Sequence, residues 1–246
     1  MKQWLTFVFV LALAVALGGA LSRIPRALAE VEAFQVDEVR LRGARFLTHE
    51  EALALLDLPP GLSVWDDVRE LELRLESHPL VKEATVHRRF PDALLFAVEE
   101  REPVALFPNP TLVPVDKDGR ILPIDPALHK LDLPILALAG RREAGSVSST
   151  DLKLMAGEVS RLAEGDPELH AKISDVVLYP SGYLRARISE PSATLSFVPG
   201  LSSRRIQTGL RVLAHALGRF QDRDVMDLDL RFADQVVVRI SSAEGN

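Results

Sequence analysis

Two groups of closely spaced carboxylates are the residues of this 246-residue chain that could perform acid–base chemistry. Glu99, Glu100 and Glu102 form one group, and Asp227 and Asp229 form the other. Paired carboxylates can divide the roles of general acid and general base. The first group lies at the charged end of a predicted hairpin, and the second alternates with apolar residues. Both patterns are more typical of a solvated polar face than of an active site.

Other motifs for catalysis or ligand binding are absent from the sequence. Without cysteine, the chain has no disulfides, thiolate metal sites or cysteine nucleophiles. It has no Gly-x-Ser-x-Gly, no glycine-rich phosphate loop and no His-Glu-x-x-His. No two of its six histidines have a metal-binding spacing; they are His49, His78, His87, His129, His170 and His215. We therefore predict no catalytic residue, metal site, cofactor or small-molecule substrate.

The charge balance argues against a nucleic-acid partner. The chain has 29 Lys and Arg against 35 Asp and Glu, a formal net charge of −6. Binding to a phosphate backbone requires concentrated positive charge, which this acidic chain does not offer.

An uncharged apolar run at residues 4–21 is about as long as the shortest helix that spans a bilayer. We expect a membrane helix there, with residues 1–3 in the cytoplasm, a linker at 22–33 and the bulk of the chain outside the cytoplasm. Charge does not decide the orientation, because positive residues lie on both sides of the run. A cleaved signal peptide and the opposite orientation stay open as alternatives.

The rest of the chain predicts an α+β fold in two domains, at 34–104 and 105–246. The first has the order β-α-α-β-β: a strand at 34–41, a helix that starts at the capping box of Thr48 and Glu51, a helix at 66–77, and strands at 81–86 and 93–98. The second is predicted as an antiparallel sheet with two helices. Its expected elements are a hairpin at 112–124, strands at 173–179, 183–189, 193–198, 225–232 and 235–240, and helices at 151–164 and 202–218. The proline-rich segment 103–114 marks the domain boundary, and the prolines at 123, 126 and 134 predict irregular structure in the segment 123–134.

The last predicted strand, residues 235–240, is short, apolar and rich in β-branched residues. At the edge of a sheet, its unpaired main-chain groups would be a template for a strand from another chain. In the interior of a sheet it would already be paired on both sides. The pattern does not choose between these two positions. If the strand is an edge, we expect proline at Val237 to remove a ladder donor and to weaken the binding of a partner strand.

Several segments occur in an order and spacing that resembles the FtsQ/DivIB family of bacterial cell-division proteins. They are VRLRG at 39–43, HPLV at 78–81, RRFPDALLFAVEEREPVA at 88–105, VDKDG at 115–119, the helix at 204–220, and the strands at 229–232 and 235–240. The resemblance implies a membrane helix, a POTRA domain at 34–104 and a β domain at 105–246.

The same resemblance implies a non-enzymatic divisome scaffold in the cytoplasmic (inner) membrane, which recruits FtsB/DivIC and FtsL to build the septum. In the family the partner adds a strand to the C-terminal edge of the β domain. Carried over by motif, that edge comprises Arg231, Phe232, Gln235, Val236, Val237, Val238, Arg239 and Ile240. Two alternatives stay open: a POTRA protein of outer-membrane assembly or secretion, and an exported acid–base hydrolase that uses the carboxylates.

Overall fold

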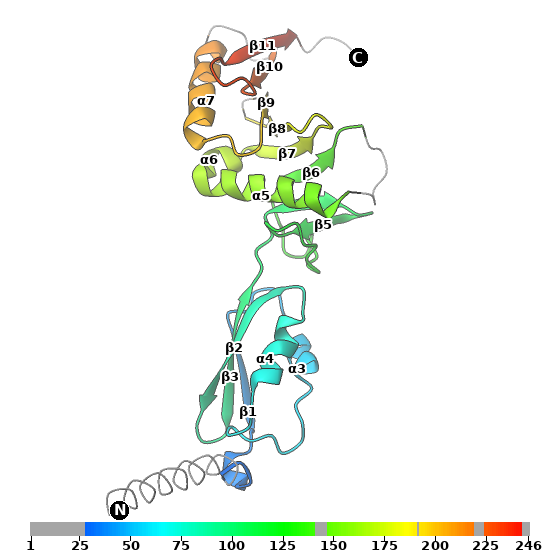
Figure 1. Cartoon of the computed structure of the whole chain (residues 1–246), viewed down its shortest axis with the longest axis vertical. Helices are drawn as coiled ribbons and strands as arrows, with labels where there is room; N and C mark the ends of the chain where they lie inside the picture. Colours follow the sequence, from blue (N-terminus) through cyan, green and yellow to red (C-terminus); the bar gives the residue numbers. More distant parts are fainter. Residues whose placement is uncertain (1–27, 141–146, 191, 219–223, 243–246) are drawn as a thin grey trace, which may run out of the picture. The chain divides into compact units, whose positions relative to one another are not determined.

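The computed structural model describes residues 28–140, 147–190, 192–218 and 224–242 (Figure 1). They form two compact units, which divide between Arg101 and Glu102. None of the helices formed by these residues is long and apolar enough to cross a membrane. The membrane helix predicted at 4–21 lies outside the described residues.

The first unit is a three-stranded sheet with two helices against one face (Figure 1). Strand β3 (Ala93–Glu100) is central, parallel to β1 (Glu38–Arg42) and antiparallel to β2 (Val81–Arg89). The helices are α3 (His49–Leu56) and α4 (Arg69–Glu76), preceded by a single 3-10 turn, η1 (Glu32–Phe34). The predicted β-α-α-β-β order is therefore confirmed. The first strand begins at Glu38 rather than at residue 34, because Phe34 ends the 3-10 turn.

Local signals in the sequence account for the start of α3 and for the core of this unit. Thr48 Oγ1 accepts the N–H of Glu51 at 3.2 Å, and the Glu51 carboxylate accepts the N–H of Thr48 at 2.9 Å. This reciprocal pair is the predicted capping box. Alternate residues of β3 face the helices, and Leu94 and Phe96 have no exposed surface. Burial of these apolar side chains is the main source of stability of the unit.

The second unit contains, in the described residues, an eight-stranded sheet in the order β11-β10-β9-β8-β7-β6-β4-β5. Its strands are β4 (Ala105–Pro108), β5 (Leu112–Val115), β6 (Ile135–Leu138), β7 (Ile173–Leu178), β8 (Leu184–Ile188), β9 (Ala193–Phe197), β10 (Asp224–Asp229) and β11 (Val237–Ser242). Its helices are α5 (Ser149–Gly165), α6 (Pro167–His170) and α7 (Ser203–Leu217). One apolar core joins the sheet to α5 and α7, and it includes Met155, Leu195, Phe197 and Ile206.

The prediction of an antiparallel sheet with two helices is wrong, because the sheet is mixed and α6 is a third, single-turn helix. The pairs β4–β6, β6–β7 and β9–β10 are parallel. A parallel pair needs a long crossover. Helix α5, followed by α6, provides it between β6 and β7, and α7 provides it between β9 and β10. Both long helices were predicted, but their role as crossovers was not.

Strand β4 lies in the proline-rich segment 103–114, and β6 begins directly after the segment 123–134; neither strand was predicted. The predicted hairpin at 112–124 is present only next to its turn. Strand β5 pairs along its whole length with β4. Beyond the turn only an isolated bridge joins Ile121 to Val115. Pro123 follows closely, and its missing N–H prevents a longer ladder there.

Gly43, at the end of β1, is expected to be intolerant of a side chain. Its φ of +89° is in the left-handed region, and a Cβ atom would lie 2.2 Å from the carbonyl oxygen of Val98. We predict that Gly43→Ala lowers the free energy of unfolding by at least about 2 kcal/mol, from backbone strain and the clash together. Gly61→Ala is the matched control, because Gly61 has a φ of +76° and open space around its Cβ position. Urea unfolding should show a clearly smaller loss for the control, and equal losses would contradict the role of the clash.

Candidate partner-docking edge

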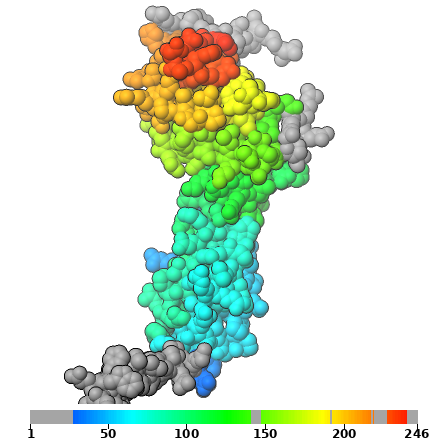
Figure 2. Space-filling view, in the orientation of Figure 1, coloured from blue at the N-terminus to red at the C-terminus, as the bar shows by residue number. Residues whose placement is uncertain are grey.

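Strand β11 is an edge of the second unit's sheet, since β10 is the only described strand with which it pairs. Figure 2 shows β11, coloured red, at the surface of the molecule. The structure therefore decides between the two positions that the sequence left open. The strand also begins at Val237 and extends to Ser242, two residues later at each end than predicted.

The register identifies which main-chain groups of β11 are available to another chain. The N–H of Leu230 donates to the carbonyl of Ser196 on β9 at 2.8 Å. Main-chain groups alternate in direction along a strand, so those of Asp229 and Asp227 point away from β9, toward β11. Their partners are Val237 and Arg239.

It follows that the N–H and C=O groups of Val238 and Ile240 point outward from the sheet. The N–H of Val237 instead belongs to the ladder with β10. Proline at Val237 would therefore remove a donor of the β10–β11 ladder, as predicted, rather than one of the outward donors.

The two faces of β11 differ in character. Val236 and Val238 are partly buried and pack against the apolar core. Val237 lies opposite Asp229, and Arg239 lies opposite Asp227, on the face away from the core. The edge therefore combines an apolar inner face with a charged outer face, while its main-chain groups remain accessible from the side.

Arg205 in the first turn of α7 holds the turn that leads into β11. Its Nη2 donates to the carbonyl oxygens of Phe232 at 2.8 Å and Gln235 at 2.7 Å. Sequence reasoning missed this residue. The N-terminal turn of a helix carries a partial positive charge, which makes it an unfavourable position for a cation. An arginine at this position therefore indicates that the guanidinium binds a group outside the helix.

A stack of side chains supports the end of β10 on the outer face. Asp229 is only 4% exposed, and it accepts hydrogen bonds from Arg231 Nε at 2.9 Å and Nη2 at 2.6 Å. The Arg231 guanidinium lies over the ring of Tyr183, 4.4 Å from its centroid, and that ring stacks on Tyr179. Cation–π and bidentate contacts of this kind fix side chains in place. Arg231 therefore fixes the C-terminal end of β10, the strand that pairs with β11.

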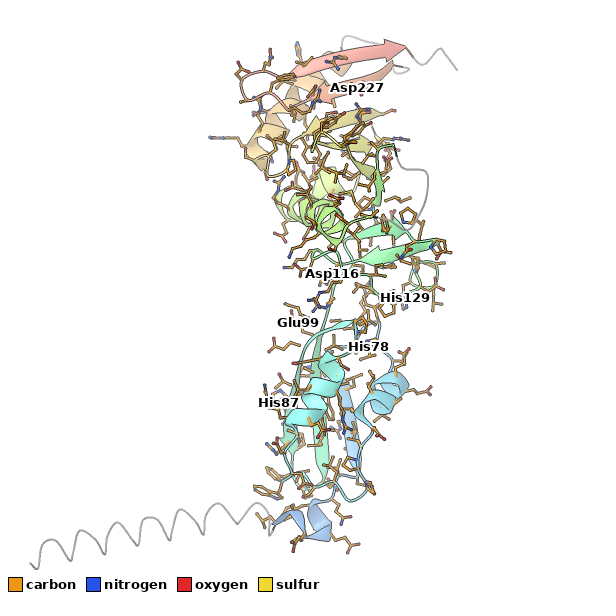
Figure 3. The ribbon with its side chains drawn as sticks, turned by 45° about the vertical axis from the view of Figure 1, so that its right-hand side comes forward. His78, His87, Glu99, Asp116, His129 and Asp227 are labelled. Carbon is orange, nitrogen blue, oxygen red and sulfur yellow. The ribbon has the colours of Figure 1, made fainter. Side chains whose placement is uncertain are left out.

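The buried carboxylate of this stack is poorly suited to acid–base catalysis. The hydrogen bonds from Arg231 lower the pKa of Asp229, despite the opposing effect of burial. An ionised carboxylate held by arginine has no proton to donate near neutral pH. The neighbouring Asp227 is half-buried on the same face (Figure 3).

Two carboxylates of the other group, Glu99 and Glu100, have structural roles in the first unit. Glu99 forms an ion pair with Lys82 on the neighbouring strand. Glu100 accepts the N–H groups of Arg45, Phe46 and Leu47, at 2.7–3.1 Å, and so fixes the loop before α3. These contacts explain the charged end of the hairpin without any catalytic role.

Among the described residues, no three potential metal ligands come together. The histidines labelled in Figure 3, His78, His87 and His129, belong to separate segments.

A family model described as "POTRA domain, FtsQ-type" matches residues 34–101. A protein of Anaeromyxobacter sp. named "Cell division protein FtsQ" is 28% identical over 242 residues, which cover 96% of this chain and 81% of that protein.

Two shorter matches have related names. "Cell division protein FtsQ" of Syntrophotalea carbinolica is 30% identical over 44% of this chain and 39% of that protein. "Cell division protein DivIB" of Geobacillus kaustophilus is 32% identical over 35% of this chain and 34% of that protein.

The β-α-α-β-β unit and these matches define a non-enzymatic component of the bacterial division machinery. Residues 34–101 match the FtsQ-type POTRA domain, and the chain is similar over most of its length to an FtsQ cell-division protein. This assignment replaces the two alternatives, an outer-membrane assembly protein and a hydrolase.

The Asp229–Arg231 pair should make stability depend on pH at the acid end. Because the folded pKa of Asp229 is lowered, its contribution is complete above the unfolded pKa and is lost as pH falls through the folded value. We predict that Asp229→Asn costs about 1–3 kcal/mol of unfolding free energy near neutral pH. The difference from the wild type should shrink below about pH 4. Urea unfolding at several pH values measures this, with the exposed Asp132→Asn as control. A constant difference at every pH would contradict the assigned pair.

Loss of the Arg205 contacts should loosen β11 without unfolding the unit. Arg205→Met keeps the apolar stem and removes both hydrogen bonds to the turn carbonyls. We predict that the amides of Val237 and Arg239 then exchange with solvent roughly tenfold faster, equivalent to about 1.4 kcal/mol. Hydrogen exchange by NMR should show unchanged β9 amides. The neighbouring Arg204→Met is the control, and an equal effect there would contradict the specific role of Arg205.

Proposed function

We propose that this chain is a membrane-anchored divisome scaffold whose β11 edge accepts a strand from a partner of the FtsB/DivIC type. Docking at this edge recruits that partner, together with an FtsL-like protein, to the site of septum assembly. The docking surface comprises the eight residues assigned by resemblance: Arg231, Phe232, Gln235, Val236, Val237, Val238, Arg239 and Ile240.

The observation that carries this proposal is the outward direction of the main-chain groups of Val238 and Ile240 on an edge strand. Among the described residues, no hydrogen-bond partner is found for these groups. Natural edge strands are usually protected against pairing with other chains. An edge left open, but held in place by Arg205, fits a strand that has to be available for pairing.

Another sheet edge in this protein is closed by side chains. In the first unit, β2 is an edge, and two of its N–H groups donate to carboxylates of α4. Ala84 N–H donates to Glu76 at 3.2 Å and Val86 N–H to Glu72 at 2.9 Å. A strand added to β2 would have to displace both carboxylates. The contrast favours β11 as the docking edge.

The proposal extends to topology and domain limits. The anchor is the apolar run at 4–21, with residues 1–3 in the cytoplasm and the linker at 22–33. The POTRA domain at 34–104 and the β domain at 105–246 then lie outside the cytoplasm. The similarity to an FtsQ cell-division protein and the length of the apolar run support this arrangement.

Proline at Val238 tests the docking edge directly. Val238→Pro removes an outward N–H and leaves the β10–β11 ladder intact, and proline is tolerated on the open side of an edge strand. We predict roughly tenfold weaker binding of an FtsB/DivIC partner, from the lost donor and the bulk of the ring. Isothermal titration of the full-length proteins measures the affinity, and rescue of septation in a depleted host measures the function.

Two further variants separate docking from folding. Val238→Ala shortens the same side chain but keeps the N–H, so it should bind nearly as well as the wild type. Val237→Pro breaks the β10–β11 ladder and should lower stability as well as binding. Unchanged affinity and full rescue by a folded Val238→Pro protein would show that β11 is not the docking edge.

A further inference from the structure

The open face of the first unit's sheet contains a trough that follows the central strand β3. Its floor is formed by small and apolar side chains on alternate positions, Ala93, Leu95 and Ala97. The side chains on the two flanking strands are larger. Arg40 and His87 lie beside Leu95, and Arg42 and Thr85 lie beside Ala97. Short residues between long ones make the surface concave along the strand.

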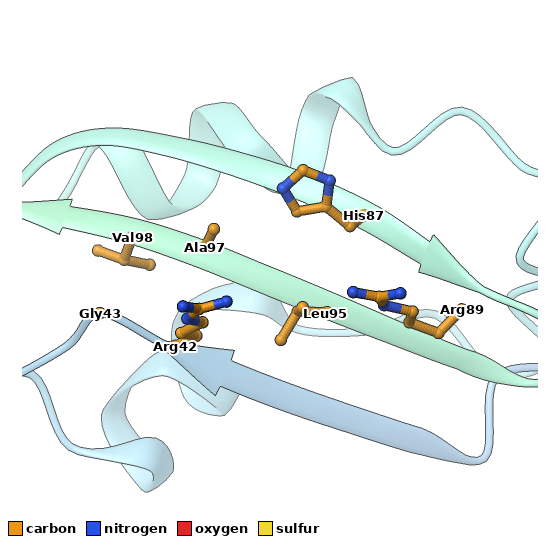
Figure 4. Close-up of a pocket in the computed structure, with 7 residues that line it drawn as sticks. All are labelled: Arg42, Gly43, His87, Arg89, Leu95, Ala97 and Val98. Carbon is orange, nitrogen blue, oxygen red and sulfur yellow. The ribbon is translucent and has the colours of Figure 1, made fainter.

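Two adjoining hollows mark this trough. The first, of about 450 Å³, is lined by Arg42, Gly43, His87, Arg89, Leu95, Ala97 and Val98 (Figure 4). The second, of about 410 Å³, shares Arg89 and Leu95 with the first and extends to the exposed ring of Phe90. The helices α3 and α4 cover the opposite face of the sheet (Figure 1). Nothing in the described part of the chain fills either hollow.

The charged side chains that line the first hollow, Arg42 and Arg89, are both positive. Arg42 and Arg89 form no ion pair among the described residues, and Figure 4 shows them on either side of Leu95. Arg40 is different, because both of its contacts, at 2.6 and 2.8 Å, go to Glu38. Glu99 is likewise occupied by Lys82. The two available guanidinium groups therefore flank an apolar floor.

We propose that this trough binds an acidic peptide segment of a protein partner. An apolar side chain of the segment packs on Leu95 and Ala97, and carboxylates before and after it pair with Arg42 and Arg89. The site is separate from the β11 edge and goes beyond the docking function proposed for it.

The apolar floor is the reason to choose a peptide over another anion. Arginine can pair bidentately with either carboxylate or phosphate, so charge alone does not decide the ligand. A peptide can place carboxylates on both sides of an apolar side chain. A phosphate headgroup or a nucleotide backbone has no apolar group between its charges, and it would leave the floor in contact with water.

Fluorescence anisotropy of labelled probe peptides tests the proposal with the full-length chain in non-ionic detergent. The first probe is a short peptide of Glu, Leu and Ala; the second replaces Glu with Gln, and the third replaces Leu with Ser. We expect only the first to bind well. The double variant Arg42→Glu, Arg89→Glu should bind it about tenfold more weakly, since each reversed charge turns an attraction into a repulsion.

Three controls make the result decisive. Arg69→Glu, on the exposed side of α4, reverses one charge elsewhere on the unit and should leave affinity unchanged. Val238→Pro should also bind the probe normally, which separates this site from the β11 edge. Glycerol phosphate, a soluble phospholipid headgroup, should not displace the probe. Equal affinity of the double variant, tight binding of the Gln probe, or displacement by glycerol phosphate would each overturn the proposal.

Discussion

The parallel pairing of β9 with β10 is the constraint on which the C-terminal edge depends. Helix α7 makes the crossover between these strands, and Gly209 on α7 lies close to Leu230, where a Cβ atom would be 2.7 Å from a methyl carbon. The register of β10 on β9 then decides that Asp227 and Asp229 pair with β11. A shift of one residue would exchange the inward and outward groups of β11 and turn its apolar face to solvent.

Much of the fold was predictable because its signals are local. The capping box of Thr48 and Glu51, the β2–β3 hairpin and the amphipathic α5 each depend on residues close in the chain. The strands β4 and β6 were missed, because four-residue strands in proline-rich segments have no clear period. Their order in the sheet depends on long-range packing, which no single segment encodes.

The candidate site was predictable only in part, for the same reason. A β-prone run at the end of the chain indicated the strand, but edge or interior position is a property of the whole sheet. The contact between Arg231 and Tyr183 joins residues 48 positions apart in the chain, and Arg205 reaches Gln235 across 30 positions. The alternation of Asp227 and Asp229 with apolar residues predicted a polar outer face. It did not predict that Asp229 would be buried beneath Arg231.

The outer face of the C-terminal sheet explains how an added strand could be selected as well as accepted. One row across the sheet runs Asp175, Arg187, Thr194, Asp227 and Arg239. The first two form an ion pair at 3.1 Å. Arg239 ends the row at the open edge, with an acidic neighbour on only one side. Cross-strand pairs of opposite charge stabilise a sheet, whereas like charges destabilise it. In the proposed complex, main-chain pairing would provide affinity for any strand, and Arg239 would favour a strand that places a carboxylate beside it.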